Sequence, residues 1–276
     1  HPDLKVVFGD GLRISVGLRL CLSCGFVFHD NILSLSELEK VYLQEDRITH
    51  KKDGIQKKKL LSCALGFLHE NFNFSDKSNV IDIGSGDFSL LDSLSTDYPT
   101  VLFDAVNVSY KDSTRGKIRV FHTMLEDMTN SDSQYRLVIL SHILEHVADF
   151  NTFFDSLKKI TTTETQLYVE VPFQVGPGIL LNRGFHAQHI NYFTPQTLEF
   201  LMEKYGYKMD NIEFDTKGGY YYYGIPGVIR AKFSYAPREQ YLPNSVKSVM
   251  SSLFYFVDPT IYIAGRLRTL LFQKIL

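Results

Sequence analysis

The residues with the clearest chemical potential form a glycine turn after an apolar stretch. The segment NVIDIGSGDFSLL (79–91) turns through Gly84, Ser85 and Gly86, where an alternating apolar run gives way to a helical pattern. Glycine lets the backbone approach a nucleotide-like ligand because no Cβ stands in the way. The third glycine of the dinucleotide fingerprint is missing, and Ser89 stands in its place. By itself, the turn is therefore a weak indication of a nucleotide-like cofactor.

Two polar residues near the next strand are candidates for holding a ribose. In dinucleotide-binding folds an acid stands at the tip of the second strand, roughly 20 residues after the turn. Asp104 lies at about this separation, and Asn107 lies where the alternation of TVLFDAVNV (100–108) places the strand end. A carboxylate accepts from both ribose hydroxyls, whereas asparagine offers one acceptor and a donor. Both residues stay open as candidates, and either can equally be a surface turn residue.

Four histidines stand in two short segments, SHILEHV (141–147) and FHAQHINYF (185–193). Histidine is the natural proton acceptor near neutral pH, so His189, His146 and His186 are candidate general bases. A structural role is the alternative for each, and for His146 it is the more common one. Nearby carboxylates, Glu145 and Glu170, can orient a histidine or satisfy backbone donors.

Alternating strand and helix patterns must position these residues. Strand patterns cover 79–84, 100–108, 117–123, 135–142 and 165–173, and helical patterns cover 55–71, 88–95, 147–160 and 194–207. Such alternation implies parallel strands with right-handed crossovers. Two final strands, 208–215 and 220–233, have no helix between them and predict an antiparallel hairpin at the sheet edge. We therefore expect an α/β fold with a mostly parallel, seven-stranded, Rossmann-like sheet and helices on both faces.

The same patterns predict three parts of the chain. Residues 1–32 form a small N-terminal β module, because apolar and polar residues alternate around turn glycines there. Residues 33–236 form the Rossmann-like domain, which starts with a helix at 33–42. Residues 237–276 form a helical extension, whose amphipathic pattern predicts packing on the domain or on a partner.

Four motifs in order along the chain resemble the class I S-adenosylmethionine-dependent methyltransferases. The likeness is strongest to the branch with "LEH" after strand four and "E-x-P" at the end of strand five, and it covers roughly residues 20–215. The matching residues are Asp82, Gly84 and Gly86, then Leu144-Glu145-His146-Val147, then Glu170-Val171-Pro172, then HINYFTPQTLEFLMEKYGY (189–207). Each motif alone is weak, but their order and spacing together favour this fold.

The resemblance implies a cofactor, S-adenosylmethionine, and a place for each part of it. The glycine turn would face the methionine and ribose parts, and Asp104 or Asn107 would hold the ribose hydroxyls. Residues after strand three, including Leu125 and Glu126, would frame the adenine. Ser141 and His142 would lie beneath the donor methyl group.

The same resemblance points to a histidine as the base. In sugar C-methyltransferases of this kind, a histidine-rich "HEH" precedes a "YF" pair, and His189 aligns with its last histidine. Gln188 replaces the glutamate of that motif, so the family's mechanism is less readily carried over to His189. The implied function is methyl transfer to a small-molecule acceptor, such as a sugar nucleotide or natural-product intermediate.

Two alternatives stay open. A catalytically degenerate binding protein is supported by Phe88, Asn107 and Arg136, which depart from the family pattern, and the ring of Phe88 would narrow the space beside the cofactor. An NAD-dependent oxidoreductase is the less favoured alternative, because Ser89 breaks the fingerprint and no Tyr-x-x-x-Lys stands at the expected position.

A cysteine pair near the N-terminus resembles half of a zinc module. Some sugar C-methyltransferases carry such a module before the catalytic domain, and Cys21-x-x-Cys24-Gly25 matches its second half. A structural zinc needs four protein ligands, and residues 1–20 contain no other cysteine. Cys21 and Cys24 are thus the candidate metal ligands, but folding without zinc is the stronger expectation.

Composition limits the classes of partner. The chain has 29 basic and 31 acidic residues among 276, so it has no global attraction to nucleic acid or anionic lipid. No apolar run is long enough to span a membrane, and no signal peptide is visible. With three cysteines and no secretory signal, we expect a cytoplasmic protein with reduced thiols that binds a small molecule. The sequence leaves the methyl acceptor and the oligomeric state open.

Overall fold

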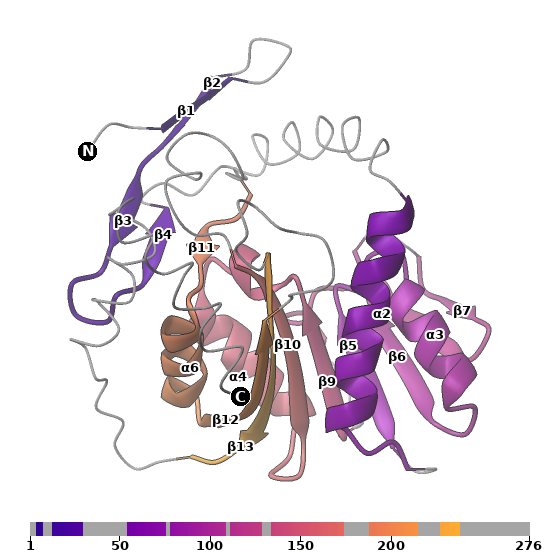
Figure 1. The fold of residues 1–276 in the computed structure, drawn as a ribbon. Helices are drawn as coiled ribbons and strands as arrows, with labels where there is room; N and C mark the ends of the chain where they lie inside the picture. The colour runs from indigo at the N-terminus through magenta and orange to yellow at the C-terminus, as the bar shows by residue number, and fades with distance from the viewer. Residues whose placement is uncertain are drawn as a thin grey trace, which may run out of the picture.

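The structure, a computed structural model, describes residues 4–7, 13–29, 54–75, 78–108, 111–128, 134–173, 188–214 and 227–237. The strands of its main sheet are β5 (Asn79–Ile83), β6 (Leu102–Val106), β7 (Ser113–Arg115), β8 (Ile118–Phe121), β9 (Leu137–Ser141), β10 (Gln166–Pro172), β12 (Tyr207–Phe214) and β13 (Val228–Tyr235). They form an eight-stranded sheet in the order β12-β13-β10-β9-β5-β6-β8-β7 (Figure 1).

Strand pairing confirms the predicted mostly parallel sheet. β10, β9, β5, β6 and β8 pair in parallel, in that order. β13 runs antiparallel to both β10 and β12, which gives the expected hairpin at the sheet edge. The eighth strand, β7, pairs antiparallel with β8 at the other edge and was not predicted. Its three residues are all exposed, so no buried–exposed alternation marks it in the sequence.

Helices cover both faces of this sheet, as expected. α2 (Gly54–Asn71) and α3 (Ser89–Asp97) share one hydrophobic core with sheet residues such as Val80 and Ile139. α4 (Phe150–Ile160) and α6 (Pro195–Lys204) share a second core with residues of the opposite face, such as Ile81 and Leu140. Neighbouring residues of one strand enter different cores because side chains alternate between the faces of a sheet. Figure 1 shows α2 and α3 in front of the sheet.

The start of α4 differs from the predicted start at residue 147. Leu144–His146 form a short 3₁₀ helix, η1, and the regular helix begins only at Phe150. Asp149 caps α4, because its carboxylate accepts hydrogen bonds from the backbone of Asn151 and Thr152. The LEH motif therefore lies in a tight turn between strand and helix, next to the end of β9.

The described N-terminal strands are joined to the main domain by a small second sheet. β1 (Leu4–Val7) and β2 (Arg13–Val16) form an antiparallel hairpin. β3 (Leu18–Leu20), β4 (Val27–His29) and β11 (Asn191–Tyr192) form a three-stranded sheet, in which β4 pairs with β11. Because β11 begins two residues after His189, this sheet includes part of the predicted site segment FHAQHINYF (185–193). The predicted helix at 33–42, residues 220–226 of the last predicted strand, His186 and nearly all of the tail lie outside the described residues.

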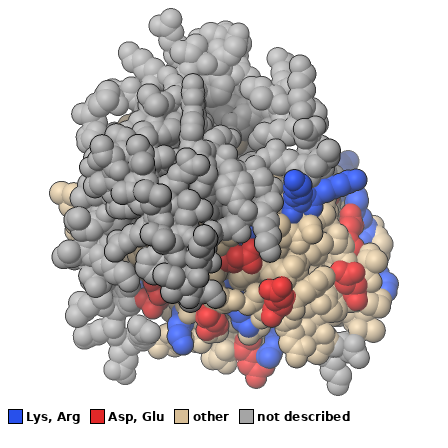
Figure 2. Space-filling view, in the orientation of Figure 1, with Lys and Arg blue, Asp and Glu red and all other residues tan. Residues whose placement is uncertain are grey.

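The surface of the described chain carries mixed charge. Figure 2 shows acidic and basic side chains interspersed, with a basic group near the N-terminal half of α2, where Lys57, Lys58 and Lys59 are exposed. Of the helices described, none is long and apolar enough to cross a membrane.

Candidate active site

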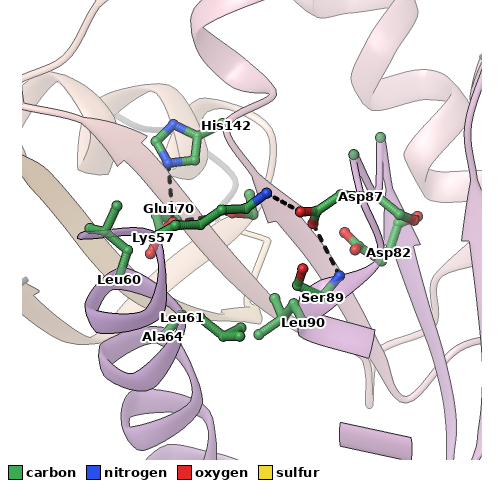
Figure 3. Close-up of a pocket in the computed structure, with 14 residues that line it drawn as sticks. Lys57, Leu60, Leu61, Ala64, Asp82, Asp87, Ser89, Leu90, His142 and Glu170 are labelled. Carbon is green, nitrogen blue, oxygen red and sulfur yellow. Dashed lines mark hydrogen bonds and ion pairs between the residues drawn. The ribbon is translucent and has the colours of Figure 1, made fainter. Parts of the chain in front are cut away.

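A cavity of about 350 Å³ lies at the carboxyl ends of the central parallel strands. Its walls include Gly84, Ser85 and Gly86 after β5, Ser141 and His142 at the end of β9, and Glu170 of β10. The apolar side comes from α2, through Leu60, Leu61 and Ala64 (Figure 3). Ligands of open α/β sheets bind at this end of the strands.

The glycine turn is held in a conformation that favours glycine. Gly84 and Gly86 have φ angles of +74° and +53°, which side chains disfavour. The backbone N–H groups of Gly84 and Ser85 both donate to the carbonyl of Val106, at 2.8 and 3.3 Å. A Cβ on Gly84 would collide with Cδ1 of Ile143. The turn is therefore a narrow backbone cradle fixed to the end of β6, which fits a nucleotide-like ligand.

The two ribose candidates have different surroundings. Asp104 lies in the middle of β6 and does not line the cavity, and its carboxylate accepts hydrogen bonds from Arg119 (2.7 and 2.6 Å) and from the hydroxyl of Tyr135 (2.7 Å). Asn107 follows the end of β6, and its Nδ2 donates to the carbonyl of Gly86 at 3.2 Å. The structure thus places Asn107, and not Asp104, beside the turn, and neither of the two lines the cavity.

A network of charges, in which Glu145, Glu170 and Arg230 are buried and His142 is partly exposed, lies at the ends of β9 and β10. His142 Nδ1 is 3.1 Å from Glu145 Oε1, and its Nε2 is 3.2 Å from Glu170 Oε1. The other oxygen of Glu170 is 2.5 Å from Nε of Arg230, a fully buried arginine of β13. The hydroxyl of Tyr168 donates to the same oxygen at 2.8 Å. His142 itself has a φ of 55°, an uncommon value for a residue other than glycine.

These contacts shift the titration of the network. Burial alone would lower the pKa of His142, but the hydrogen bonds and charges of Glu145 and Glu170 outweigh it and raise the pKa to about 10. Burial would raise the pKa of Glu170, but His142, Arg230 and Tyr168 outweigh it and lower the pKa to about 2. His142 is therefore a cation at neutral pH and not a base.

The pKa of Asp82 is raised, whereas the pKa of Glu170, another carboxyl group of the cavity, is lowered. Asp82 is 3% exposed at the floor of the cavity, and burial raises its pKa to about 8, against a smaller lowering by a hydrogen bond from Ser85. The carboxyl group is thus largely protonated at neutral pH.

Two of the three predicted base histidines lie together. The rings of His146 and His189 have centroids 4.8 Å apart and are nearly perpendicular. Nδ1 of His146 donates to the carbonyl of Gln188 at 2.9 Å, and its Nε2 is 3.9 Å from Glu145 Oε1. Since Glu145 also contacts His142, this pair is one residue removed from the cavity wall. His186, the third candidate, is outside the described residues.

A sequence-family profile described as "Methyltransferase domain" (Methyltransf_23) matches residues 57–212, more than half of the chain. The chain belongs to this methyltransferase family. The match spans the glycine turn, the cavity, the LEH element and α6. It overturns the NAD-dependent oxidoreductase alternative, because the whole sheet core falls within the family.

A solved methyltransferase structure has the same fold. The methyltransferase resembles Burkholderia thailandensis 1,6-didemethyltoxoflavin-N1-methyltransferase with bound 1,6-didemethyltoxoflavin and S-adenosylhomocysteine, at a TM-score of 0.53 and 13% identity over 76% of this chain and 96% of that one. A further match is CalO1, a methyltransferase in calicheamicin biosynthesis in its S-adenosylhomocysteine-bound form, with a TM-score of 0.49 and 14% identity over 73% of this chain and 59% of that one. Comparison with curated protein sequences found no match.

Several predicted residues of the methyltransferase lie away from the cavity. Leu125 is buried in a hydrophobic core and Glu126 is half-buried, and neither lines the cavity. Phe88 is 2% exposed and packs in the core with α2 and α3, so the prediction that its ring narrows the cavity is wrong. Arg136 forms a surface ion pair with Glu164. Neither Phe88 nor Arg136 obstructs the site, which removes their support for a degenerate protein.

Sequence reasoning missed the contribution of α2 and of Arg230. Lys57 of α2 reaches across the cavity mouth to form an ion pair with Asp87 of the glycine turn (Figure 3). The apolar face of the helix at 55–71 was a signal that some of its residues lie on the sheet. No sequence signal marked Arg230, because it lies 60 residues beyond Glu170 and meets it only through antiparallel pairing.

Cys21 and Cys24 lie in the turn between β3 and β4 and are not joined by a disulfide. In the described part of the chain, no further cysteine, histidine or carboxylate is grouped with them at metal-binding distance. They remain a predicted half-site.

Proposed function

We propose that the protein transfers a methyl group from S-adenosylmethionine to a small-molecule acceptor, with the cofactor in the cavity at the ends of β5 and β9. S-adenosylmethionine supplies a methyl group activated by a sulfonium sulfur. The observation that carries the proposal is the cradle of Gly84 and Gly86, which is bonded to the end of β6 and opens into a 350 Å³ cavity within a methyltransferase domain. The proteins bound to S-adenosylhomocysteine that share this fold support the same cofactor.

The residues of the chain bind and orient the reactants. Asn107, held against Gly86, is the proposed ribose contact, and the apolar face of α2 packs against the ligand and excludes water. The region of Leu125 and Glu126 stays the proposed adenine site. Ser141 and His142 lie at the proposed methyl end, where a fixed cation helps to hold the carboxylate of the cofactor. Methyl transfer needs mainly such alignment of donor and acceptor.

The acceptor is proposed to be a small molecule of the sugar-nucleotide or natural-product type. The LEH, E-x-P and HINYF motifs support this finer assignment, as does the heteroaromatic substrate of the Burkholderia enzyme. On the described face in Figure 2, acidic and basic side chains are interspersed and form no continuous basic track of the kind that nucleic acid needs. The histidine pair His146 and His189 is the proposed place where the proton of the acceptor is handled, with His186 as the further candidate. The division at residues 33 and 236, with a CxxC module before the domain, remains part of this proposal.

Direct binding is the first test. Isothermal titration calorimetry of the full chain should show one saturable site for S-adenosylmethionine and for S-adenosylhomocysteine, and none for NAD. Asn107→Ala should weaken S-adenosylhomocysteine binding about tenfold, because a ribose contact of one good hydrogen bond contributes on the order of 1.4 kcal/mol. Asn211→Ala, a change at an exposed amide on β12, is the matched control and should bind normally.

The outcome that sinks the proposal is the absence of saturable binding by either cofactor form, with the protein folded by circular dichroism. Once binding is established, formation of S-adenosylhomocysteine with a panel of small acceptors tests turnover. Full activity in a His189→Ala variant would remove His189 from the reaction.

A further inference from the structure

Three side chains beside the cavity are grouped as metal ligands usually are. One ligand atom each from Glu145, His146 and His189 lies within 4.8 Å of the other two. Zinc ligands bind at about 2.0–2.2 Å, so tetrahedral partners stand roughly 3.4 Å apart. Small side-chain rotations would bring the three atoms to that spacing. A carboxylate with two imidazoles is a common donor set for divalent first-row ions.

A second, independent observation points to a ligand here. Within the described part of the chain, no group hydrogen-bonds Oε2 of Glu145, although the residue is only 1% exposed. A buried carboxylate oxygen without a partner costs several kcal/mol in general, so such atoms are rare and need an explanation. His142 occupies Oε1, at 3.1 Å, and leaves Oε2 for another cation.

The hydrogen bonding of His146 prepares its ring for a metal. Its Nδ1 must carry a proton, because it donates to the carbonyl of Gln188 at 2.9 Å. In the neutral ring Nε2 then holds the lone pair. This atom lies 3.9 Å from Oε1 of Glu145. Metal-ligating histidines usually donate their second nitrogen to a carbonyl or carboxylate in this way, which fixes the tautomer and the ring orientation.

The backbone around the three side chains is held from both sides. Ile190 N–H donates to the carbonyl of Glu145 at 2.8 Å. Nδ2 of the buried Asn191 donates to the carbonyls of Leu144 and Val147, at 3.0 and 2.7 Å. Segments more than 40 residues apart in the chain are thereby fixed side by side, so the site exists before any ligand arrives.

We infer that Glu145, His146 and His189 bind a divalent transition-metal ion at the edge of the cofactor cavity. Three protein ligands leave at least one coordination position open, as in catalytic metal sites. We assign the open coordination position to an oxygen atom of the methyl acceptor, which the ion would orient and polarise. This assignment rests on the proposed function. A histidine that ligates through Nε2 has no lone pair for a proton, so this role replaces that of general base.

Zinc binding by the full chain tests the inference without any assay of activity. The protein is first stripped with a chelator and carries Cys21→Ser and Cys24→Ser, so that thiolates do not compete. Titration calorimetry should then show one Zn²⁺ per chain, and Co²⁺ should give an absorption spectrum without thiolate charge-transfer bands. His146→Ala and His189→Ala should each weaken zinc binding at least tenfold, and Glu145→Gln should do the same.

The matched control is His69→Ala, which removes a half-exposed histidine paired with Asp97 on the surface and should leave zinc affinity unchanged. Circular dichroism and S-adenosylhomocysteine binding check that each variant is folded. The inference fails if the chain with Cys21→Ser and Cys24→Ser binds no zinc, or if both histidine variants bind it as tightly as their parent. S-adenosylmethionine binding by the stripped protein is independent, so failure of the metal site is distinguishable from failure of the proposed function.

Discussion

His142 combines an unfavourable backbone conformation with a fixed charge. A non-glycine residue at a φ of 55° costs free energy that the surrounding structure must offset. Two flanking carboxylates do so by binding the imidazolium, and Glu170 is in turn balanced by Arg230. The result is a cation that stands in the cavity wall without serving as a base.

The raised pKa of Asp82 should make the stability of the fold depend on pH. The folded-state pKa of about 8 lies above the usual value of 3.8, so between these values the folded protein keeps a proton that the unfolded chain has lost. The free energy of unfolding should therefore fall as pH rises from about 4 to about 8, by at most about 1.4 kcal/mol per pH unit from this residue. Asp82→Asn removes the titration, and the fall should be smaller in that variant.

The measurement is urea unfolding of both proteins, without ligand, from pH 4 to pH 9. Taking the difference between wild type and variant cancels the contributions of the other titrating groups. A difference that stays constant over this range would show that the carboxyl group of Asp82 titrates normally.

At the scale of the elements, the site depends on how close the glycine turn comes to η1. Gly84 faces Ile143, the residue just before η1, and a Cβ there would collide with Cδ1 of that side chain. Gly116 also has a positive φ, +61°, but nothing lies within 4 Å of its Cβ position. Comparing alanine substitutions at Gly84 and Gly116 therefore separates the effect of the positive φ angle from the effect of the collision with Ile143.

We expect Gly84→Ala and Gly116→Ala both to destabilise the fold by about 1–2 kcal/mol, the cost of placing alanine in the left-handed region. Only Gly84→Ala should also weaken S-adenosylhomocysteine binding, because the tip of the Ile143 side chain must turn away from the new methyl group. Adding Ile143→Val, which deletes Cδ1, should restore part of the affinity. Equal affinities for the two alanine variants, measured by calorimetry, would contradict this account.

At the scale of the whole molecule, the small sheet β3-β4-β11 ties the N-terminal strands to the active-site edge. Phe26, just before β4, packs against Phe150 and Phe193, with ring centroids 6.2 and 5.4 Å away. The backbone of His29 donates to the carbonyl of Ile190 at 2.9 Å. The segment that carries His189 is thus held between the N-terminal strands and η1.

Asn191 is the side chain that connects this segment to η1. Asn191→Ala would leave the carbonyl of Val147 without this donor and the carbonyl of Leu144 with only the long 3.4 Å bond from the N–H of Val147, which should cost about 1–3 kcal/mol of stability. Urea unfolding measures this loss. Asn211→Ala is the control, because its amide is exposed, and it should change stability by about 0.5 kcal/mol or less. Similar losses in the two variants would argue against a special role for Asn191.

Much of the architecture was predictable from local patterns. The parallel strands around β5 and the edge hairpin followed from the order of strand and helix patterns, because burial on one or both faces leaves a period in the sequence. The glycine turn and LEH element were found as motifs, since each needs particular residue types at short spacing. β7, η1 and β11 were missed, because strands and turns of two or three residues are too short to show a period.

Local sequence patterns were enough to predict the methyltransferase fold and the place of the glycine turn, since both depend on neighbours along the chain. Which polar side chains meet could be read only from the packed structure. It turned Asp104 to Arg119, buried Phe88, paired Glu170 with Arg230, and brought His189 to His146 and Glu145. Such contacts join residues that are tens of positions apart, and they are set by strand register and core packing, which leave no local mark in the sequence.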